Sequence, residues 1–189
     1  RVSAYPAEVT AQMVANFEAG GAAINQLCDL SGIKLDVVPI DLDTPTNDIS
    51  QSDSMNEQEC LNAIMIGFNA VNDKTDILLL GEMGIGNTTV ASALCLASFG
   101  GNATAWVGSG TGITDDVLPH KAQVIETAFS KHKDHIQTSF DLLQKLGGRE
   151  LAAITGAIIK ARQKNIPVVL DGFITVSAAA SLLKSNPKA

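Results

Sequence analysis

Apolar residues along the chain follow two patterns, helical spacing and short continuous runs, and the two patterns alternate. Leu61, Ile64 and Phe68 recur at helical intervals and predict an amphipathic helix, which the capping-box spacing of Ser54 and Glu57 would begin. The same spacing predicts helices over 6–28, 54–72, 88–98, 138–146 and 149–163, around 124–129, and from about 176 onward.

Short apolar runs lie between these helices and predict strands. Residues 76–80, 104–107 and 167–170 form such runs, whereas residues 35–41 alternate and contain a proline that weakens the strand pattern. Helices that alternate with apolar strands are typical of a parallel sheet covered on both faces. We therefore predict an α/β fold with three layers, a mostly parallel sheet with helices on both faces, and a single domain over residues 1–189.

The most distinctive segment is the glycine-rich turn Gly-Glu-Met-Gly-Ile-Gly-Asn-Thr-Thr at 81–89, between a predicted strand and a predicted helix. Its glycines let the backbone approach a ligand closely, and a helix N-terminus attracts phosphate. Asn87 and Thr88 add side-chain hydrogen bonds there, and Glu82 adds a carboxylate. We expect Glu82, Gly84, Asn87 and Thr88 to form part of a nucleotide site, although Glu82 could instead cap a neighbouring helix.

Two further glycine turns follow predicted strands, at 108–112 and 171–172. Ligands of parallel sheets bind beyond the carboxyl ends of the strands, so the three turns are expected to converge on one crevice. Neither 81–89 nor 108–112 is a complete Walker A or dinucleotide motif, and α/β loops often contain glycine for steric reasons alone. Together the turns favour a mononucleotide or phosphosugar site.

Other candidate residues have two interpretations each. Lys121 could reach a phosphate at the second turn, although its spacing alone favours an exposed surface lysine. Asp171 could bind ribose hydroxyls or only hydrogen-bond the loop backbone. Tyr5, Pro6 and Met13 could line an apolar pocket, although the default for Met13 is the core.

Composition and charge limit the class of protein. Hydrophobic residues make up 46% of the 189, which predicts a sizeable core. A net charge of −7 with no basic cluster argues against a general nucleic-acid binder. No apolar run approaches the roughly 20 residues that span a membrane, and no signal peptide is visible. We expect a soluble, cytoplasmic protein.

The cysteines and histidines do not suggest a metal site. Cys28, Cys60 and Cys95 are widely spaced within apolar helical patterns, which predicts buried free thiols in a reducing compartment. The three histidines fall on a polar helical stretch and are expected at the surface; they are His120, His132 and His135. We therefore expect no bound metal.

Several segments together resemble a known family, the nicotinate-nucleotide:dimethylbenzimidazole phosphoribosyltransferases. The matching segments are spread along nearly the whole chain, at 2–6, 8–14, 20–25, 81–89, 110–112 and 169–173. The resemblance implies a Rossmann-like parallel sheet, a homodimer, and no metal or cofactor. It also implies transfer of phosphoribose from nicotinate mononucleotide to 5,6-dimethylbenzimidazole, which gives α-ribazole 5′-phosphate for the lower ligand of cobalamin.

The resemblance also implies roles for individual residues. Glu82 matches an active-site glutamate near the ribose and the base, and Met83 and Gly84 match contacts beside it. On the phosphoribose side, the matching or adjoining positions are Asn87, Thr88, Gly110, Gly112, Lys121 and Asp171. Tyr5, Pro6 and Met13 fall where the family lines its base pocket. Some members have glutamine at the position of Met13, which leaves the acceptor base open.

The chain departs from the family pattern in length. It ends at Ala189 without the Gly-Glu-Gly motif whose glutamate is the favoured general base of the family, and it opens just before the Tyr-Pro motif. We expect a fragment, or a chain completed by another, with little or no transferase activity alone. The alternatives are a module that only binds a mononucleotide, or a related transferase with another acceptor such as a phenol or adenine.

Overall fold

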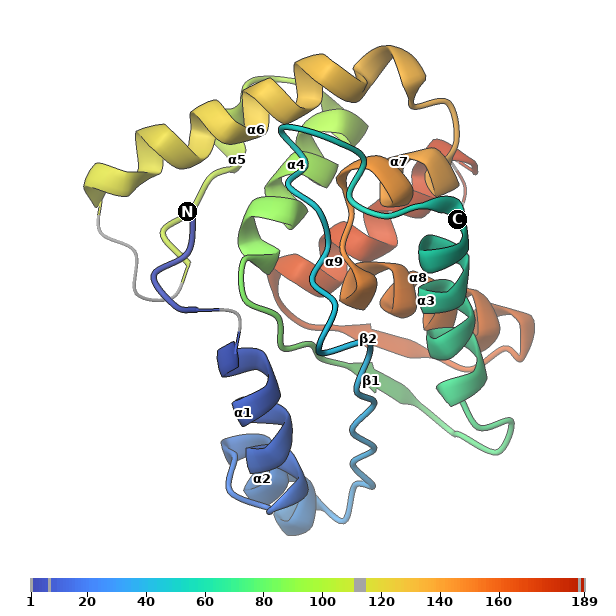
Figure 1. Ribbon diagram of the computed structural model, residues 1–189. Coiled ribbons are helices and arrows are strands. Elements are labelled where there is room, and N and C mark those ends of the chain that lie inside the picture. The colour runs from blue at the N-terminus through green and yellow to red at the C-terminus, as the bar shows by residue number, and fades with distance from the viewer. Residues whose placement is uncertain (1, 7, 111–114, 187, 189) are drawn as a thin grey trace.

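A computed structural model describes residues 2–6, 8–110, 115–186 and 188 (Figure 1). The helices and strands are α1 Glu8–Glu18, α2 Ala23–Ser31, α3 Glu57–Ala70, β1 Leu78–Leu80, α4 Asn87–Phe99, α5 Ala103–Trp106, α6 Leu118–His132, α7 Ser139–Leu146, α8 Arg149–Gln163, β2 Val168–Leu170 and α9 Gly172–Ser181. Short 3-10 helices cover Asp115–Val117, Lys133–His135 and Leu182–Lys184. Helices thus account for most of the described chain.

The sheet is parallel, as the sequence predicts, but small. β1 and β2 pair with Leu78 opposite Val168 and Leu80 opposite Leu170, and within the described residues the sheet has these two strands. The predicted strand over 35–41 is wrong, because residues 33–40 have no regular structure, and a proline there lacks the N–H that a ladder needs. The α/β class is confirmed with a sheet of two strands.

The predicted strand over 104–107 is also wrong, because residues 103–106 form the short helix α5. The Asn102 side chain caps this helix by accepting a hydrogen bond of 3.0 Å from the Ala105 N–H. The Trp106 indole N–H donates to the Gly100 carbonyl at 3.0 Å. These local hydrogen bonds outweigh the strand preference of a run that is too short to show a period.

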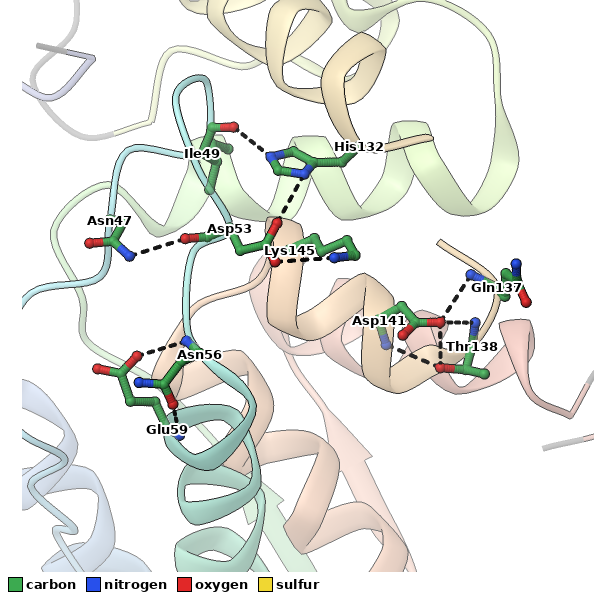
Figure 2. A network of polar contacts seen from close by, with 10 residues as sticks. All are labelled: Asn47, Ile49, Asp53, Asn56, Glu59, His132, Gln137, Thr138, Asp141 and Lys145. Carbon is green, nitrogen blue, oxygen red and sulfur yellow. Dashed lines mark hydrogen bonds and ion pairs between the residues drawn. The ribbon is translucent and has the colours of Figure 1, made fainter. Parts of the chain in front are cut away.

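The predicted helices agree with the structure except at some ends. The helix predicted over 6–28 is two helices, α1 and α2, separated at Gly20, which has φ +74°. α9 begins at Gly172 and so precedes the predicted start near 176. The predicted capping box of Ser54 and Glu57 is wrong, because α3 uses Asn56 and Glu59 instead, with reciprocal hydrogen bonds of 2.8 and 2.9 Å (Figure 2).

The core is made mainly by α4 and by the pair α3 and α8. α4 is buried on most of its surface and packs against α6, α7 and α9, which explains its run of small and apolar residues. α3 and α8 approach closely through two glycines. A Cβ on Gly67 would lie 1.8 Å from the Ala153 carbonyl oxygen, and one on Gly156 would lie 1.9 Å from that of Ile64. α1 and α2 project from this helical body (Figure 1).

A polar network fixes the loop before α3 to α6 and α7 (Figure 2). Nε2 of His132 lies 2.9 Å from the Ile49 carbonyl oxygen, and Nδ1 lies 3.3 Å from Asp53. Lys145 donates to the other Asp53 oxygen at 3.1 Å. The prediction that the histidines lie at the surface is therefore wrong for His132, which is buried, and right for His120 and His135.

The remaining predictions on composition concern thiols, metals and membranes. The three cysteines are free and buried, as predicted, and burial raises the pKa of Cys60 to about 12 and that of Cys95 to about 11. Across the described ranges, no helix has the length and apolarity needed to cross a membrane. In the same ranges, no group of three or more His, Cys, Asp or Glu side chains is placed to hold a metal ion.

Candidate active site

A cavity of about 390 Å³ lies where the β1–α4 turn faces α1 and the start of α9. Its walls come from Val2, Ser3 and Tyr5, from Val9 and Met13 of α1, from residues 82–88, and from Ile174 of α9. The cavity thus collects Tyr5, Met13, Glu82, Met83, Gly84, Asn87 and Thr88, all predicted as site residues. Met13 is half-buried and lines this cavity, so its default assignment to the core is wrong.

The turn between β1 and α4 opens the first turn of α4 to the cavity. Gly86 adopts φ +93° at the N-cap position and provides no side-chain cap. The Ile85 N–H donates to the Thr10 hydroxyl of α1 at 3.3 Å, which joins the turn to the opposite wall. An uncapped helix N-terminus presents N–H groups and a positive partial charge, which suit an anion.

Glu82 is held by the first residue of α4. The Asn87 amide donates a hydrogen bond of 2.5 Å to Glu82 Oε2. Among the described contacts, the Glu82 carboxylate therefore accepts from a side chain and does not cap the backbone of a helix. Burial raises the pKa of Glu82, the Asn87 hydrogen bond opposes this, and the nearby charge of Glu150 raises it further. Glu82 therefore keeps a proton to a higher pH than an ordinary glutamate.

Lys121 lies beside the same helix N-terminus. Its side chain is fully buried, and Nζ donates to Thr88 Oγ1 at 2.8 Å and to the Gly108 carbonyl at 3.0 Å. Burial lowers the pKa of Lys121. The spacing-based expectation of an exposed lysine is therefore wrong, and the residue links α6, the start of α4 and the second glycine turn.

The other predicted residues differ in whether they contact the start of α4 or line the cavity. Gly110 packs on Thr88, because a Cβ there would lie 3.1 Å from Thr88 Oγ1, and its φ is +61°. Gly112 lies outside the described residues. Pro6 and Asp171 are exposed and are not among the residues that line the cavity. The Asp171 side chain makes no capping hydrogen bond to α9, whereas the backbone carbonyl of Asp171 accepts a hydrogen bond from the Thr175 hydroxyl.

Glu150 lies beside the candidate site, and the sequence analysis missed it. A Cβ on Gly84 would lie 2.2 Å from Glu150 Oε1 and 2.3 Å from Asn87 Nδ2, so the three groups meet at one point. Burial raises the pKa of Glu150, and its own backbone N–H, Arg149 and Asn87 partly offset this. An acidic residue in the first turn of a helix predicts only a favourable contact with the helix dipole, so no local pattern reveals that Glu150 lies beside Gly84 and Asn87.

A second cavity of about 400 Å³ lies between α1, α2 and residues 33–37, away from the glycine turns. Its lysine, Lys34, is paired with Asp36 at 2.8 Å. Its amide, Asn25, is already used in capping α2, where it accepts from the Ala22 N–H and donates to the Phe17 carbonyl. The other charged residues that line it, Glu18 and Asp29, are acidic and would repel a phosphate, so the cavity at the β1–α4 turn is the better candidate.

Comparison with known proteins gives consistent results. A sequence model of the phosphoribosyltransferase family matches residues 1–189. The nicotinate-nucleotide–dimethylbenzimidazole phosphoribosyltransferase of Methylorubrum extorquens is 54% identical over 189 residues, which are 100% of this chain and 55% of that protein. The protein of the same name from Brucella anthropi is 47% identical over 188 residues, 100% of this chain and 56% of its own length.

The solved structures agree with the sequence relatives. The crystal structure of CobT from Thermus thermophilus is similar with a TM-score of 0.85 and 34% identity, over 98% of this chain and 61% of that one. These structural neighbours have a Rossmann-like fold, as predicted for this chain. The chain spans about half the length of the curated relatives that it matches. The chain belongs to the phosphoribosyltransferase family, as its resemblance predicted.

Proposed function

We propose that the protein transfers phosphoribose from nicotinate mononucleotide to 5,6-dimethylbenzimidazole and releases nicotinate and α-ribazole 5′-phosphate, a pentosyl transfer in cobalamin lower-ligand assembly. The observation that carries this proposal is the juxtaposition at the start of α4. There, the buried cation of Lys121 contacts Thr88, and the carboxylate of Glu82 contacts Asn87, one residue earlier. In a bound nucleotide, the phosphate would lie beside Lys121 and Thr88, and the ribosyl group would lie beside Glu82 and Asn87.

The phosphate side of the proposed site combines a helix N-terminus with a lysine. Lys121 donates two hydrogen bonds to groups in the described part of the chain, and an ammonium has three N–H donors. We assign the third to a phosphate oxygen of the bound mononucleotide, which the first turn of α4 also attracts. We assign Gly84, Asn87, Thr88, Gly110, Gly112, Lys121 and Asp171 to phosphoribose binding, with Asp171 acting from the rim.

The base side of the proposed site is apolar. Tyr5, Met13 and Met83 line the same cavity as Glu82, and methionine and tyrosine suit contact with flat aromatic rings. Pro6 follows Tyr5 and is assigned to the same wall. We propose that nicotinate and the benzimidazole occupy this part of the cavity in turn or together.

The proposed reaction needs little chemistry from the protein beyond positioning. A benzimidazole nitrogen forms a bond to C1′ of the ribose, while the bond from C1′ to the pyridinium nitrogen breaks and its electron pair returns to nicotinate. The proton on the other benzimidazole nitrogen then passes to a base. In the proposed complex Glu82 lies beside the ribosyl carbon, where positive charge develops, and a negative carboxylate there would lower the energy of the transition state.

A second candidate function follows from the length of the chain. Because the chain spans 55% of the Methylorubrum relative, these 189 residues could bind the mononucleotide while turnover needs residues from the rest of such a protein. In this account the general base is supplied from outside the chain. The two functions differ in whether the 189 residues release nicotinate by themselves.

A chimera separates the two functions. The 189 residues would replace the matching span of the Methylorubrum relative, and nicotinate release from nicotinate mononucleotide plus 5,6-dimethylbenzimidazole would be followed by chromatography. We expect turnover by the chimera, little by the chain alone, and mononucleotide binding by both. A folded chimera that neither binds the mononucleotide nor turns over, beside an active parent relative, would overturn the proposed function. Turnover by the chain alone at the rate of the chimera would remove the second candidate.

We also propose that the protein acts as a homodimer in the cytoplasm and binds neither nucleic acid nor membranes. Exposed apolar residues on β1, β2 and α9 support an interface between copies; they are Leu79, Val169, Phe173 and Val176. The buried free thiols support a reducing compartment. The charge of −7 opposes binding to phosphate backbones. Sedimentation velocity tests the oligomer, and a monomer at all concentrations would contradict it.

A further inference from the structure

A second carboxylate, that of Glu150, reaches the proposed site from α8. Glu150 Oε1 lies 2.2 Å from the position of a Cβ on Gly84, and Asn87 Nδ2 lies 2.3 Å from the same position. A real Cβ does not approach atoms so closely, so any larger residue would displace both groups. The glycine at 84 thus leaves the space through which a carboxylate from α8 meets the start of α4.

The amide of Asn87 lies between the two carboxylates. It donates to Glu82 Oε2 at 2.5 Å on one side. On the other side, Asn87 Nδ2 and Glu150 Oε1 lie 2.3 and 2.2 Å from one point, the position of a Cβ on Gly84, so the second carboxylate adjoins the same amide. Asn87 is only 7% exposed, so its orientation depends on these partners and little on water. An amide NH₂ has two donors, which is the number that two acceptor carboxylates require. The arrangement of Glu82, Asn87 and Glu150 is therefore a chain of side chains with Asn87 at its centre.

We propose that Glu150 is a positioning residue of the phosphoribosyl-transfer site, which orients Glu82 through Asn87 and keeps one proton within the carboxylate pair. This inference rests on the proposed function for its role in catalysis, and on the geometry alone for the coupling of the two carboxylates. Glu150 itself does not line the cavity, so it acts on the substrate through Glu82.

The charged groups around the pair support sharing of a proton. Burial raises the pKa of both carboxyls, and the charge of Glu150 raises that of Glu82 further. The charge of Arg149, the neighbour of Glu150, offsets part of the rise in the pKa of Glu150, and its guanidinium also pairs with Asp41 and Glu59. The ammonium of Lys121 is directed to Thr88 and Gly108. Two half-buried carboxylates on either side of one amide favour one shared negative charge.

A titration of Glu82 tests the coupling without any need for turnover. Glutamate side chains labelled with ¹³C at the carboxyl carbon would be titrated by NMR, and the Glu82 signal would be assigned by its loss in Glu82→Gln. We expect Glu150→Gln to lower the midpoint of the Glu82 titration, because it removes a negative charge that disfavours ionisation. The matched control is Glu57→Gln, which removes an exposed glutamate from the first turn of α3 and should leave the midpoint unchanged. An unchanged midpoint in Glu150→Gln would overturn the proposal.

Kinetics of the chimera test the role in catalysis. We expect Glu150→Gln to lower kcat at least tenfold with a smaller change in KM. The limb of the pH profile that disappears in Glu82→Gln should move to lower pH. A merely structural role would change stability and leave that limb in place, which would contradict the proposal. An inactive parent chimera would instead count against the proposed function, and the titration would still decide the coupling.

A second variant covers the case in which Glu150→Gln does not fold. Glu150→Asp keeps the charge but shortens the side chain, so it weakens the contact with Asn87. We expect a Glu82 midpoint near that of the unchanged protein and a lowered kcat. A kcat equal to that of the unchanged chimera would overturn the positioning role.

Discussion

Replacing Lys121 by methionine is the sharpest test of the phosphate side of the site. Methionine is apolar and can occupy much of the space of the buried lysine stem, so the change removes a charge and three N–H donors with a small change in volume. Among the described contacts, Thr88 and Gly108 use two of these donors. The proposed site gives the third donor to the phosphate of nicotinate mononucleotide.

The expected loss of affinity follows from one charge-assisted hydrogen bond. Such a bond contributes about 1.5–3 kcal/mol. This converts to a dissociation constant for nicotinate mononucleotide that is roughly 10- to 150-fold higher in Lys121→Met. Nicotinate without a phosphoribosyl group should bind both proteins equally, because it has no phosphate for the lysine to contact.

Isothermal titration calorimetry measures both constants. The matched control is Lys131→Met, which removes an exposed lysine from the same helix, α6, and gives the same change in net charge. Lys131→Met should bind the mononucleotide as the unchanged chain does. Equal affinity in a folded Lys121→Met would refute the assignment of Lys121 to the phosphate.

The stability of Lys121→Met has its own pH dependence. Burial lowers the pKa of Lys121 in the folded state, so the unfolded state binds more protons between this lowered value and the ordinary one. The free energy of unfolding of the unchanged chain should therefore gain a contribution as pH rises through that window. Lys121→Met lacks this contribution, which urea unfolding at several pH values measures. A parallel pH dependence in the two proteins would contradict the burial of a titrating amine.

Three further predictions concern the core, the loop network and Glu82. Gly156→Ala places a Cβ 1.9 Å from the α3 backbone and should lower the free energy of unfolding by about 1–3 kcal/mol in urea, whereas Gly81→Ala, with open space around it, should not. His132→Leu removes two polar contacts and should destabilise by about 1–3 kcal/mol, unlike His135→Leu at an exposed position; equal midpoints would contradict the network. Burial raises the pKa of Glu82, so the free energy of unfolding should fall as pH rises from the ordinary pKa of a glutamate to the raised one. Glu82→Gln should remove this contribution, which thermal unfolding at several pH values measures. The same pH dependence in both proteins would contradict the raised pKa.

The sequence predicts what local patterns determine. Helical spacing predicts α8 at its observed bounds and α7 to within one residue, because their apolar faces repeat at the helical period over whole turns. The 81–89 turn is predicted as the start of a helix because its glycines follow an apolar run. Parallel pairing of the strands before 81 and 171 follows from the helices between them.

The sequence does not predict contacts between distant segments. The burial of Lys121 depends on Thr88 and Gly108, which come from two other segments, and spacing on α6 alone suggests an exposed residue. Glu150 reaches the site only because α8 passes behind Gly84. The short helix α5 is missed because one asparagine cap outweighs a weak strand pattern. These features depend on tertiary packing, which local spacing does not encode.

The account rests on the claim that the β1–α4 turn and Lys121 hold a mononucleotide. A crystal structure of the chain with nicotinate mononucleotide tests this claim most directly. We predict the phosphate within hydrogen-bond distance of Lys121 Nζ and the first turn of α4, the ribose facing Glu82, and the nicotinate ring against Met83. A mononucleotide bound in the other cavity, between α1 and α2, with the Lys121 region unoccupied at saturating ligand, would contradict the account.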